Sequence, residues 1–221
     1  MSERDGDMRR TRRALALVAA ASMMLWAPAE SLAGPATDQV KGTVDRVLKI
    51  LADPGLKGEK KLQERRAKIR EVVLQRFGFT EMSKRALGRY WSERTPQERT
   101  EFVGLFTDLL ERAYIDRVDG YVGEQVVYMG ESVDGDYSEV RSKIVTKKNQ
   151  EIPIMYRLQK NDSSWEVYDV VVEGVSLVNN YRTQFSKIIR TSSYERLVKK
   201  MQVKLEGEEA GELGAPKPKV R

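Results

Sequence analysis

The chain has 221 residues, enough for one domain with a substantial core, and 39 Lys and Arg against 33 Asp and Glu give a formal net charge of +6. It contains no histidine and no cysteine, which excludes disulfides, thiolate and imidazole metal sites, cysteine nucleophiles and histidine general bases. Catalysis would have to rest on carboxylate, Tyr, Lys or Ser side chains without a histidine base.

Residues 1–33 have the three-part pattern of a secretory signal peptide. A basic segment, "MRRTRR", precedes an uncharged apolar run from Ala14 to Trp26, and the small residues Ser31 and Ala33 follow. An uncleaved membrane anchor is the alternative, although the run is shorter than the about 20 residues that a membrane span needs. The pattern predicts export and cleavage after Ala33.

Lys and Arg are interleaved with acidic residues rather than gathered in one block, as in "KGEKKLQERRAKIRE". Such a run is typical of a solvated helix face. Together with export, this pattern argues against nucleic acid as a partner.

Three helices are predicted after this leader. Apolar residues recur at helical spacing from Asp38 until "DPG" at residues 53–55, and a second helix carries Leu62, Ile69, Val73 and Phe77 on one face. The stretch "TEMSKRALGRYW" predicts a third, short helix with Thr80 as its cap.

The strongest local signal is "TPQE". Thr95 stands at the N-cap, Pro96 at the first helical position and Glu98 three residues after the cap, which is a capping box. The helix is expected to run to about Asp119, with Gly120 ending it.

The period then changes from helical to alternating. Strands are predicted at residues 125–129, 137–146, 152–158 and 165–172, with "VDGD" as a hairpin turn. Pro153 lacks a ladder donor, so a bulge or bend is expected there, and Gly130 also permits bending.

Helices are expected at the end of the chain. A stripe of Leu177, Tyr181, Phe185 and Ile188 predicts one helix, and Ser192 with Glu195 has capping-box spacing for the next. The composition of residues 206–221 predicts a disordered tail. The domain proper is expected at residues 34–205. The predicted fold class is α+β: a curved antiparallel meander of about four strands wrapped by helices, with an apolar cavity between sheet and helices.

The corner "YDVVVEGVS" allows two interpretations. Asp169 and Glu173 could form a carboxylate pair for acid-base chemistry. Alternatively, Asp169 bonds a neighbouring segment, Glu173 and Gly174 make a turn, and Ser176 caps the following helix. The second interpretation is favoured, because no histidine exists to activate Ser176.

Three parts of the sequence together resemble a known family: "YWSERTPQERTEFVGLFTDLLERAY", the meander, and "WEVYDVVVEGVSLVNNYRTQFSKII". They are similar to the toluene-tolerance or MlaC-like proteins, which are the periplasmic phospholipid-binding, lipid-carrier components of an ABC phospholipid transport system in Gram-negative bacteria. The likeness covers about residues 40–205. The segment "NNYRTQF" is one of several variants in the family, so the resemblance assigns no partner-binding role to that helix.

The resemblance implies a periplasmic carrier that holds lipid tails in an apolar pocket, without a cofactor, metal or catalytic residue. It implies phospholipid as cargo, or other membrane lipids such as the hopanoids linked to related members. An inner-membrane ABC transporter complex and an outer-membrane lipoprotein complex are the implied partners. Tyr114 is expected beside the pocket. The side chains expected to bind lipid are Phe106, Leu110, Tyr114, Val118, Ile144, Ile154, Tyr156, Trp165, Val170, Val175 and Val178.

Two other functions remain open at this level. One is an enzyme that uses Asp169 or Tyr114 in proton transfer, which would require a buried carboxylate pointing into the cavity. The other is a ligand-free interaction module, whose interior would be filled by its own side chains.

Overall fold

The computed structural model describes residues 34–121, 123–162, 164–207 and 213–214. The expected signal peptide, residues 1–33, lies outside the described residues, as does most of the expected tail at 206–221. No helix in the described part of the chain is long and apolar enough to span a membrane.

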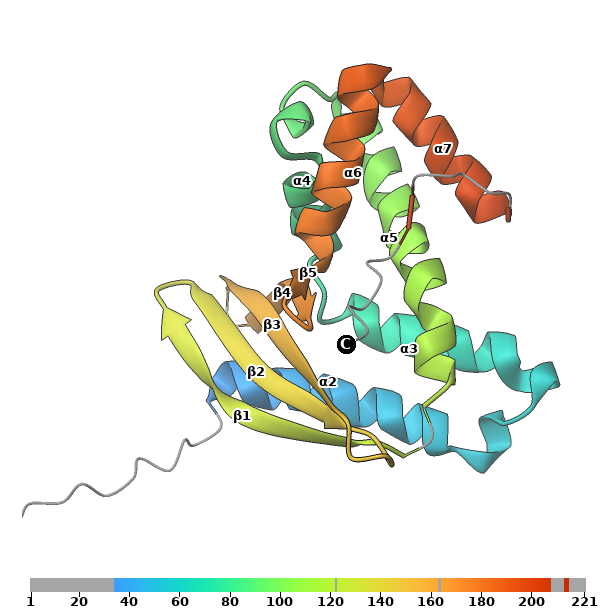
Figure 1. The fold of residues 1–221 in the computed structure, drawn as a ribbon, viewed down its shortest axis with the longest axis vertical. Coiled ribbons are helices and arrows are strands. Elements are labelled where there is room, and N and C mark those ends of the chain that lie inside the picture. Colours follow the sequence, from blue (N-terminus) through green and yellow to red (C-terminus); the bar gives the residue numbers. More distant parts are fainter. Residues whose placement is uncertain (1–33, 122, 163, 208–212, 215–221) are drawn as a thin grey trace, which may run out of the picture. The chain divides into compact units, whose positions relative to one another are not determined.

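The fold of the described residues is α+β, as predicted, with an open antiparallel sheet and six α-helices (Figure 1). The helices are α2 (Pro35–Ala52), α3 (Leu62–Leu74), α4 (Phe79–Leu87), α5 (Pro96–Asp119), α6 (Leu177–Thr191) and α7 (Tyr194–Glu206), with short 3-10 turns η1 (Pro54–Leu56), η2 (Glu59–Lys61) and η3 (Gly88–Trp91). The strands are β1 (Gln125–Asp134), β2 (Tyr137–Val145), β3 (Glu151–Asn161), β4 (Ser164–Val172) and β5 (Val175–Ser176).

Helix α5 begins as its sequence predicts. The Thr95 hydroxyl accepts from the Glu98 N–H at 3.2 Å, and the Glu98 carboxylate accepts from the Thr95 N–H at 2.7 Å. Both halves of the capping box are therefore present, and Gly120 follows the last helical residue. A long helix with a defined start can serve as a fixed wall for the elements around it.

Two predicted caps were wrong by one or two residues. Thr80 lies inside α4, whose N-cap is Gly78, because the chain is already helical from Phe79. Ser192 ends α6, and it is Ser193 that caps α7 by accepting from the Arg196 N–H at 3.2 Å. Two adjacent serines offer the same cap chemistry, and the packing of the preceding helix decides which one is used.

The sheet is a meander in the order β1-β2-β3-β4-β5, one strand more than predicted. The extra strand, β5, folds back on β4 through a two-residue turn, with Val172 paired to Val175. Glu173 and Gly174 both have positive φ, 50° and 79°, which is the conformation of a tight hairpin whose twist suits adjacent strands. The abrupt corner in the sequence is therefore a hairpin.

Two register irregularities of the kind that bends strands interrupt the sheet, one between Tyr128 and Gly130 in β1 and one in β4 at Tyr168, opposite Arg157 and Leu158 of β3. Gly130 has a φ of 105°, so its predicted role in bending is confirmed. The bulge expected at Pro153 is wrong, since Pro153 pairs in register with Lys143. Its carbonyl accepts from the Glu173 N–H at 3.0 Å. Because the N and C=O of a strand residue lie on the same side, the missing donor of Pro153 also faces the β4–β5 turn, beyond the last ladder pair, Ile154 with Val172.

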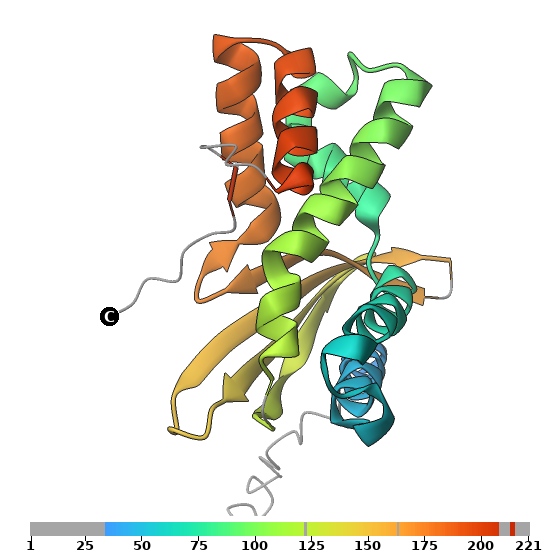
Figure 2. The ribbon, with the colours of Figure 1, turned by 90° about the vertical axis from the view of Figure 1, so that its right-hand side faces the viewer.

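Two hydrophobic cores share α5, which runs from the upper helices down beside the sheet (Figure 2). The first core, called the upper helical core below, packs α4, α5, α6 and α7 around Phe102, Phe106 and Phe185. The second packs α2 onto the inner face of the sheet around Val140 and Leu158. Two side chains, Phe77 and Tyr114, pack against both cores, so they mark the junction.

Part of the expected tail is in contact with the first core. Leu213 is 3% exposed and belongs to that core, while the Gly214 N–H donates to the Gln184 side chain at 3.1 Å.

Candidate ligand-binding cavity

A cavity of about 290 Å³ lies at the junction of the two cores. Its walls come from α3, α4, α5, the inner face of β3 and β4, and the first residue of α6. Most of the lining side chains are apolar or aromatic: Ile69, Val73, Leu74, Phe77, Phe79, Met82, Leu110, Tyr114, Ile115, Val118, Ile154, Tyr156, Val170 and Leu177. The polar lining residues are Arg70, Thr107 and Glu111.

The periodicity of each element explains which side chains reach the cavity. On α5, Thr107, Leu110, Tyr114 and Val118 recur every three or four residues and form one face. Phe102 and Phe106 continue the same stripe towards the start of α5, where they are fully buried in the upper helical core. In β3, Ile154 and Tyr156 alternate onto the inner face, and Tyr156 pairs with Val170 of β4.

The cavity reaches solvent between α3 and α5. Leu74 lines it and is nevertheless 46% exposed, and the Arg70 side chain is 38% exposed. Arg70 forms ion pairs with Asp108 and Glu111 of α5. The mouth of the cavity is therefore polar and its interior apolar.

More ion pairs join the same two helices. Arg65 and Arg66 both bond the Asp119 carboxylate, at 2.8 and 2.7 Å, and Arg66 also reaches Asp116 at 2.8 Å. The hydrogen bond to Asp119 is the main cause that raises the pKa of Arg66 above its ordinary value. These ion pairs form a charged connection between α3 and α5 along one side of the cavity.

Tyr156 is one of two tyrosines that line the cavity, and its burial determines its protonation state. Burial raises the pKa of Tyr156 to about 12, and a hydrogen bond with Ser142 counteracts only part of this effect. The phenol is therefore neutral at physiological pH and presents a weakly polar group to an apolar space.

Asp169 does not line the cavity. Its carboxylate is buried, accepts from the Ser176 hydroxyl at 2.6 Å and from the Val178 N–H at 3.0 Å, and lies 3.4 Å from the Arg157 guanidinium. Ser176 in turn caps α6 by accepting from the Asn179 N–H at 3.0 Å. The interpretation of this corner as a turn followed by a helix cap describes the observed bonds.

Glu111 is the carboxylate that lines the cavity among the described residues, and Arg70 is its partner. No group of three or more acidic side chains in the described ranges could hold a metal ion. The arrangement can exclude water from an apolar ligand and keep a charged end of that ligand at the α3–α5 rim.

A sequence model of the family described as MlaC protein matches residues 41–203, which is more than half of the chain. The chain belongs to the MlaC family. The resemblance seen in the sequence is thereby confirmed.

One relative in the MlaC family is the intermembrane phospholipid transport system binding protein MlaC of Haemophilus influenzae. It is 24% identical over 139 residues, which is 61% of this chain and 65% of the relative, just under two thirds of the relative's length. The phospholipid-binding protein from Ralstonia solanacearum, solved in complex with a phospholipid, has a similar fold with a TM-score of 0.71. That match is 28% identical and covers 79% of this chain and 98% of the other.

Six of the eleven side chains expected to bind lipid line the cavity of this MlaC-family chain. They are Leu110, Tyr114, Val118, Ile154, Tyr156 and Val170. They come from one face of α5 and from the central, inner positions of β3 and β4, which the helical and alternating periods bring together.

The other five side chains do not line it. Phe106 and Val178 are buried in the upper helical core, and Trp165 is buried in the core between α2 and the sheet. Ile144 pairs with Ile152 beside the β2–β3 hairpin, away from the cavity walls, and Val175 lies in the short edge strand β5. These residues are apolar and inward-facing by pattern, but three of them are packed into the two cores and the other two lie at the β2–β3 hairpin and in the edge strand β5.

Sequence reasoning missed the whole α3–α4 wall. Ile69, Val73 and Phe77 recur every four residues and were recognised as one apolar helix face, which was a usable signal. Nothing local indicated that this face meets α5 across a space instead of packing against it.

Proposed function

We propose that this chain is a periplasmic lipid carrier that holds the acyl chains of a phospholipid in the cavity between α3, α5 and the sheet. It would move that lipid between an outer-membrane lipoprotein complex and an inner-membrane ABC transporter complex. The observation that carries the proposal is the cavity itself, whose volume of about 290 Å³ is near the lower end of the usual range for ligand pockets. Hopanoids remain a second candidate cargo.

The chemistry of the cavity supports this role. Each methylene removed from water contributes about 0.8 kcal/mol, so a sixteen-carbon chain left in water costs on the order of 12 kcal/mol. An apolar interior therefore provides the driving force for loading. The charged rim at Arg70 and Glu111 fits a headgroup that stays at the solvent side.

The proposed activity contains no chemical step. The bonds of Asp169 support a structural role, because both carboxylate oxygens accept hydrogen bonds that hold the start of α6. We likewise propose that residues 1–33 are a cleaved signal peptide, that 34–205 form the lipid-binding domain and that 206–221 form a tail. Mass spectrometry of the exported protein should then find Gly34 as the first residue.

The test is the lipid content of the protein. Protein expressed with its leader in a bacterial host, purified without detergent and examined by native mass spectrometry should carry co-purified phospholipid. After delipidation, it should take up labelled phospholipid from vesicles. Protein that is empty as purified and that takes up no lipid would contradict the proposal.

A matched pair of variants assigns the binding to the cavity. Val118 lines it, whereas Val133 on β1 is 54% exposed and lies elsewhere. Val118→Glu places a charge against the lipid tails and should lower occupancy strongly, because a carboxylate in an apolar space is costly to bury. Val133→Glu should leave occupancy unchanged. Equal occupancy in both variants would mean that lipid binds elsewhere.

A further inference from the structure

We propose that the groove between η3 and α6 is a docking surface for an acidic face of a partner protein. The groove has a volume of about 500 Å³, and its charged lining residues are Arg89, Arg182, Lys187 and Arg190. No Asp or Glu of the described chain lines it. It shares no lining residue with the apolar cavity, so it is a separate feature of the molecule.

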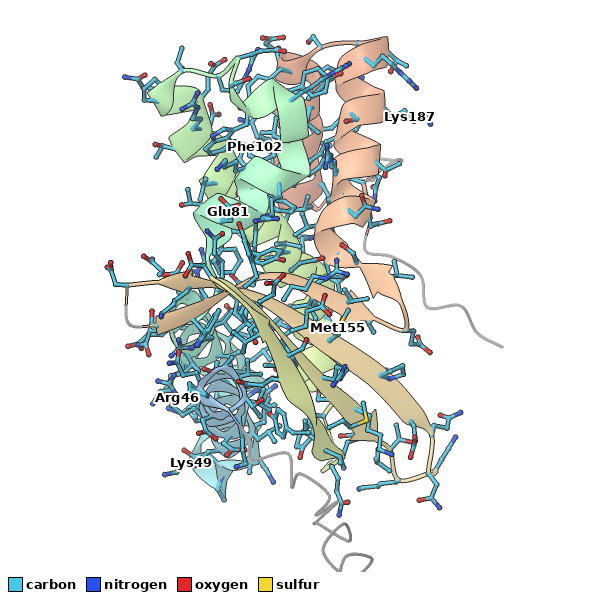
Figure 3. The ribbon with its side chains drawn as sticks, turned by 90° about the vertical axis from the view of Figure 1, so that its left-hand side faces the viewer. Arg46, Lys49, Glu81, Phe102, Met155 and Lys187 are labelled. Carbon is cyan, nitrogen blue, oxygen red and sulfur yellow. The ribbon has the colours of Figure 1, made fainter. Side chains whose placement is uncertain are left out.

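The orientation of α6 is fixed by its opposite face. Tyr181, Phe185 and Ile188 are buried in the upper helical core, at 0, 0 and 2% exposure. The cations cannot turn inward without exposing these three side chains. Lys187 extends outward from α6 (Figure 3).

The groove side of α6 has a regular stripe of polar groups. Arg182, Ser186 and Arg190 follow one another every four residues, with Asn179 and Thr183 on the same side. At 1.5 Å per residue, Arg182 and Arg190 are separated by about 12 Å along the helix. A row of carboxylates spaced at successive helical turns on a partner would match this stripe.

Three of the four cations, Arg89, Arg182 and Arg190, form no salt bridge within the described residues. Arg89 lies over the Tyr90 ring, donates to its hydroxyl at 2.9 Å and is attracted by the nearby Glu93 without forming a salt bridge with it. The arginines of α3 differ, because Arg65, Arg66 and Arg70 are all paired with α5. Grouping unpaired like charges is unfavourable for the isolated chain, and a carboxylate partner would relieve that repulsion.

The residues around the groove position one of its cations. A neighbouring recess shares Asn179 and Arg182 with the groove, and its other arginines, Arg85 and Arg157, are already paired with Glu81, Glu139 and Asp169. Among the arginines of these two features, the unpaired positive charge is therefore confined to the groove itself. Gly88, with a φ of 58°, allows the Arg182 guanidinium to approach so closely that a side chain at this position would meet it. Arginine suits carboxylate recognition, because its planar guanidinium can form two parallel hydrogen bonds.

A protein partner fits the groove better than a membrane surface does. Helices that lie on membranes combine cations with apolar side chains that insert between lipids. The large apolar residues that are exposed in the described chain are Leu74, Val127, Met129, Val133 and Tyr137. None of them lines the groove, whose lining side chains other than Tyr90 are all polar or charged.

This docking role rests on the proposed carrier function and deepens it. A carrier must meet its partners quickly and then leave them. Complementary charge mainly accelerates association and selects partners, without requiring a long-lived complex. An acidic docking face on a membrane-bound partner would therefore suit a shuttle.

The experiment measures binding of a defined probe, a labelled helical peptide with four glutamates on one face, by fluorescence anisotropy at low and moderate salt. The test variant is Arg182→Glu with Arg190→Glu. The matched control is Arg196→Glu with Lys199→Glu on exposed positions of α7, which changes the net charge equally outside the groove. Circular dichroism verifies that both variants fold.

We expect wild-type binding that weakens with salt, a loss of about tenfold or more in the test variant, and little change in the control. Equal losses in both variants, or no wild-type binding at low salt, would overturn the proposal. Groove-dependent binding to vesicles with phosphatidylglycerol but not to the peptide would also overturn it, in favour of a membrane surface. Lipid loading, measured on the same proteins, should be unaffected by the reversals. Its absence in every protein would contradict the carrier function and leave the docking result standing.

Discussion

The Ser176 hydroxyl donates a 2.6 Å hydrogen bond to the Asp169 carboxylate across the β4–β5 turn. The other carboxylate oxygen accepts from the Val178 N–H in the first turn of α6. One buried side chain on β4 thereby connects the strand, the hairpin and the helix that follows. The corner is a structural joint, and it fixes where α6 leaves the sheet.

This joint predicts a large stability loss for Asp169→Ala. The substitution leaves the Ser176 hydroxyl, the Val178 N–H and one bond of Arg157 without their acceptor, which should lower the free energy of unfolding by about 2–4 kcal/mol. Urea denaturation at neutral pH measures it. Glu139→Ala is the control, because Glu139 is the other partner of Arg157 and its side chain is 44% exposed. The control should lose less than about 1 kcal/mol. Similar losses in the two variants would contradict the claim that the hydrogen bonds of Asp169 hold β4, the hairpin and α6 together.

Filling the cavity should displace lipid. Ile154 lines the cavity and Ile144 does not, although both lie on the inner side of neighbouring strands. Ile154→Trp should exclude a few methylenes of an acyl chain and weaken phospholipid binding by about 10- to 100-fold. Titration of delipidated protein with a fluorescent phospholipid measures the affinity. Ile144→Trp should bind phospholipid as the wild type does. A larger loss of affinity in Ile144→Trp than in Ile154→Trp would mean that the ligand does not bind in this cavity.

We expect the ion pairs between α3 and α5 to slow the release of bound lipid. Asp119 is 12% exposed and holds both Arg65 and Arg66. Asp119→Asn should lower the free energy of unfolding by about 1–3 kcal/mol and speed transfer of labelled lipid to acceptor vesicles, because the ion pairs of Arg65 and Arg66 with Asp119 are lost from the connection between α3 and α5. Asp116 is 85% exposed, so Asp116→Asn should change stability by less than about 1 kcal/mol. Unchanged release from the Asp119 variant would rule out this connection as a restraint.

Because the pKa of Tyr156 is raised, we expect the folded protein to lose stability at alkaline pH. Burial raises its pKa from 10.0 to about 12 in the folded chain. Above pH about 10, the unfolded chain gives up this proton while the folded chain keeps it, so the free energy of unfolding falls as the pH rises. One pKa unit corresponds to about 1.4 kcal/mol, and we expect a loss of about 1–2 kcal/mol from this group. Urea titrations at pH about 9 and about 11.5 measure it. Tyr156→Phe should show a smaller loss over this interval, and a loss equal to that of the wild type would show that Tyr156 is not responsible.

Much of the local structure could be predicted, because its causes are local. The capping box at Thr95 and Glu98 needs only neighbouring residues, and it formed as expected. The Thr80 cap failed because α4 begins at Phe79 with Gly78 as its N-cap, and the Ser192 cap failed because the chemically identical Ser193 is used instead. The bulge expected at Pro153 is absent, because Pro153 lies just beyond the last ladder pair of β3 and β4, where its lack of a donor does not break that ladder.

The sequence by itself determined the α+β class, the order of helices and strands, the family resemblance and the apolar faces of α5 and β3. It could not decide which apolar faces pack together and which remain apart. Leu110 and Phe106 differ by four positions on α5 and both belong to the upper core, yet only Leu110 also lines the cavity. Only the tertiary structure made that distinction, because the hydrophobic effect rewards removal from water in both places, whereas an empty space depends on how several elements meet.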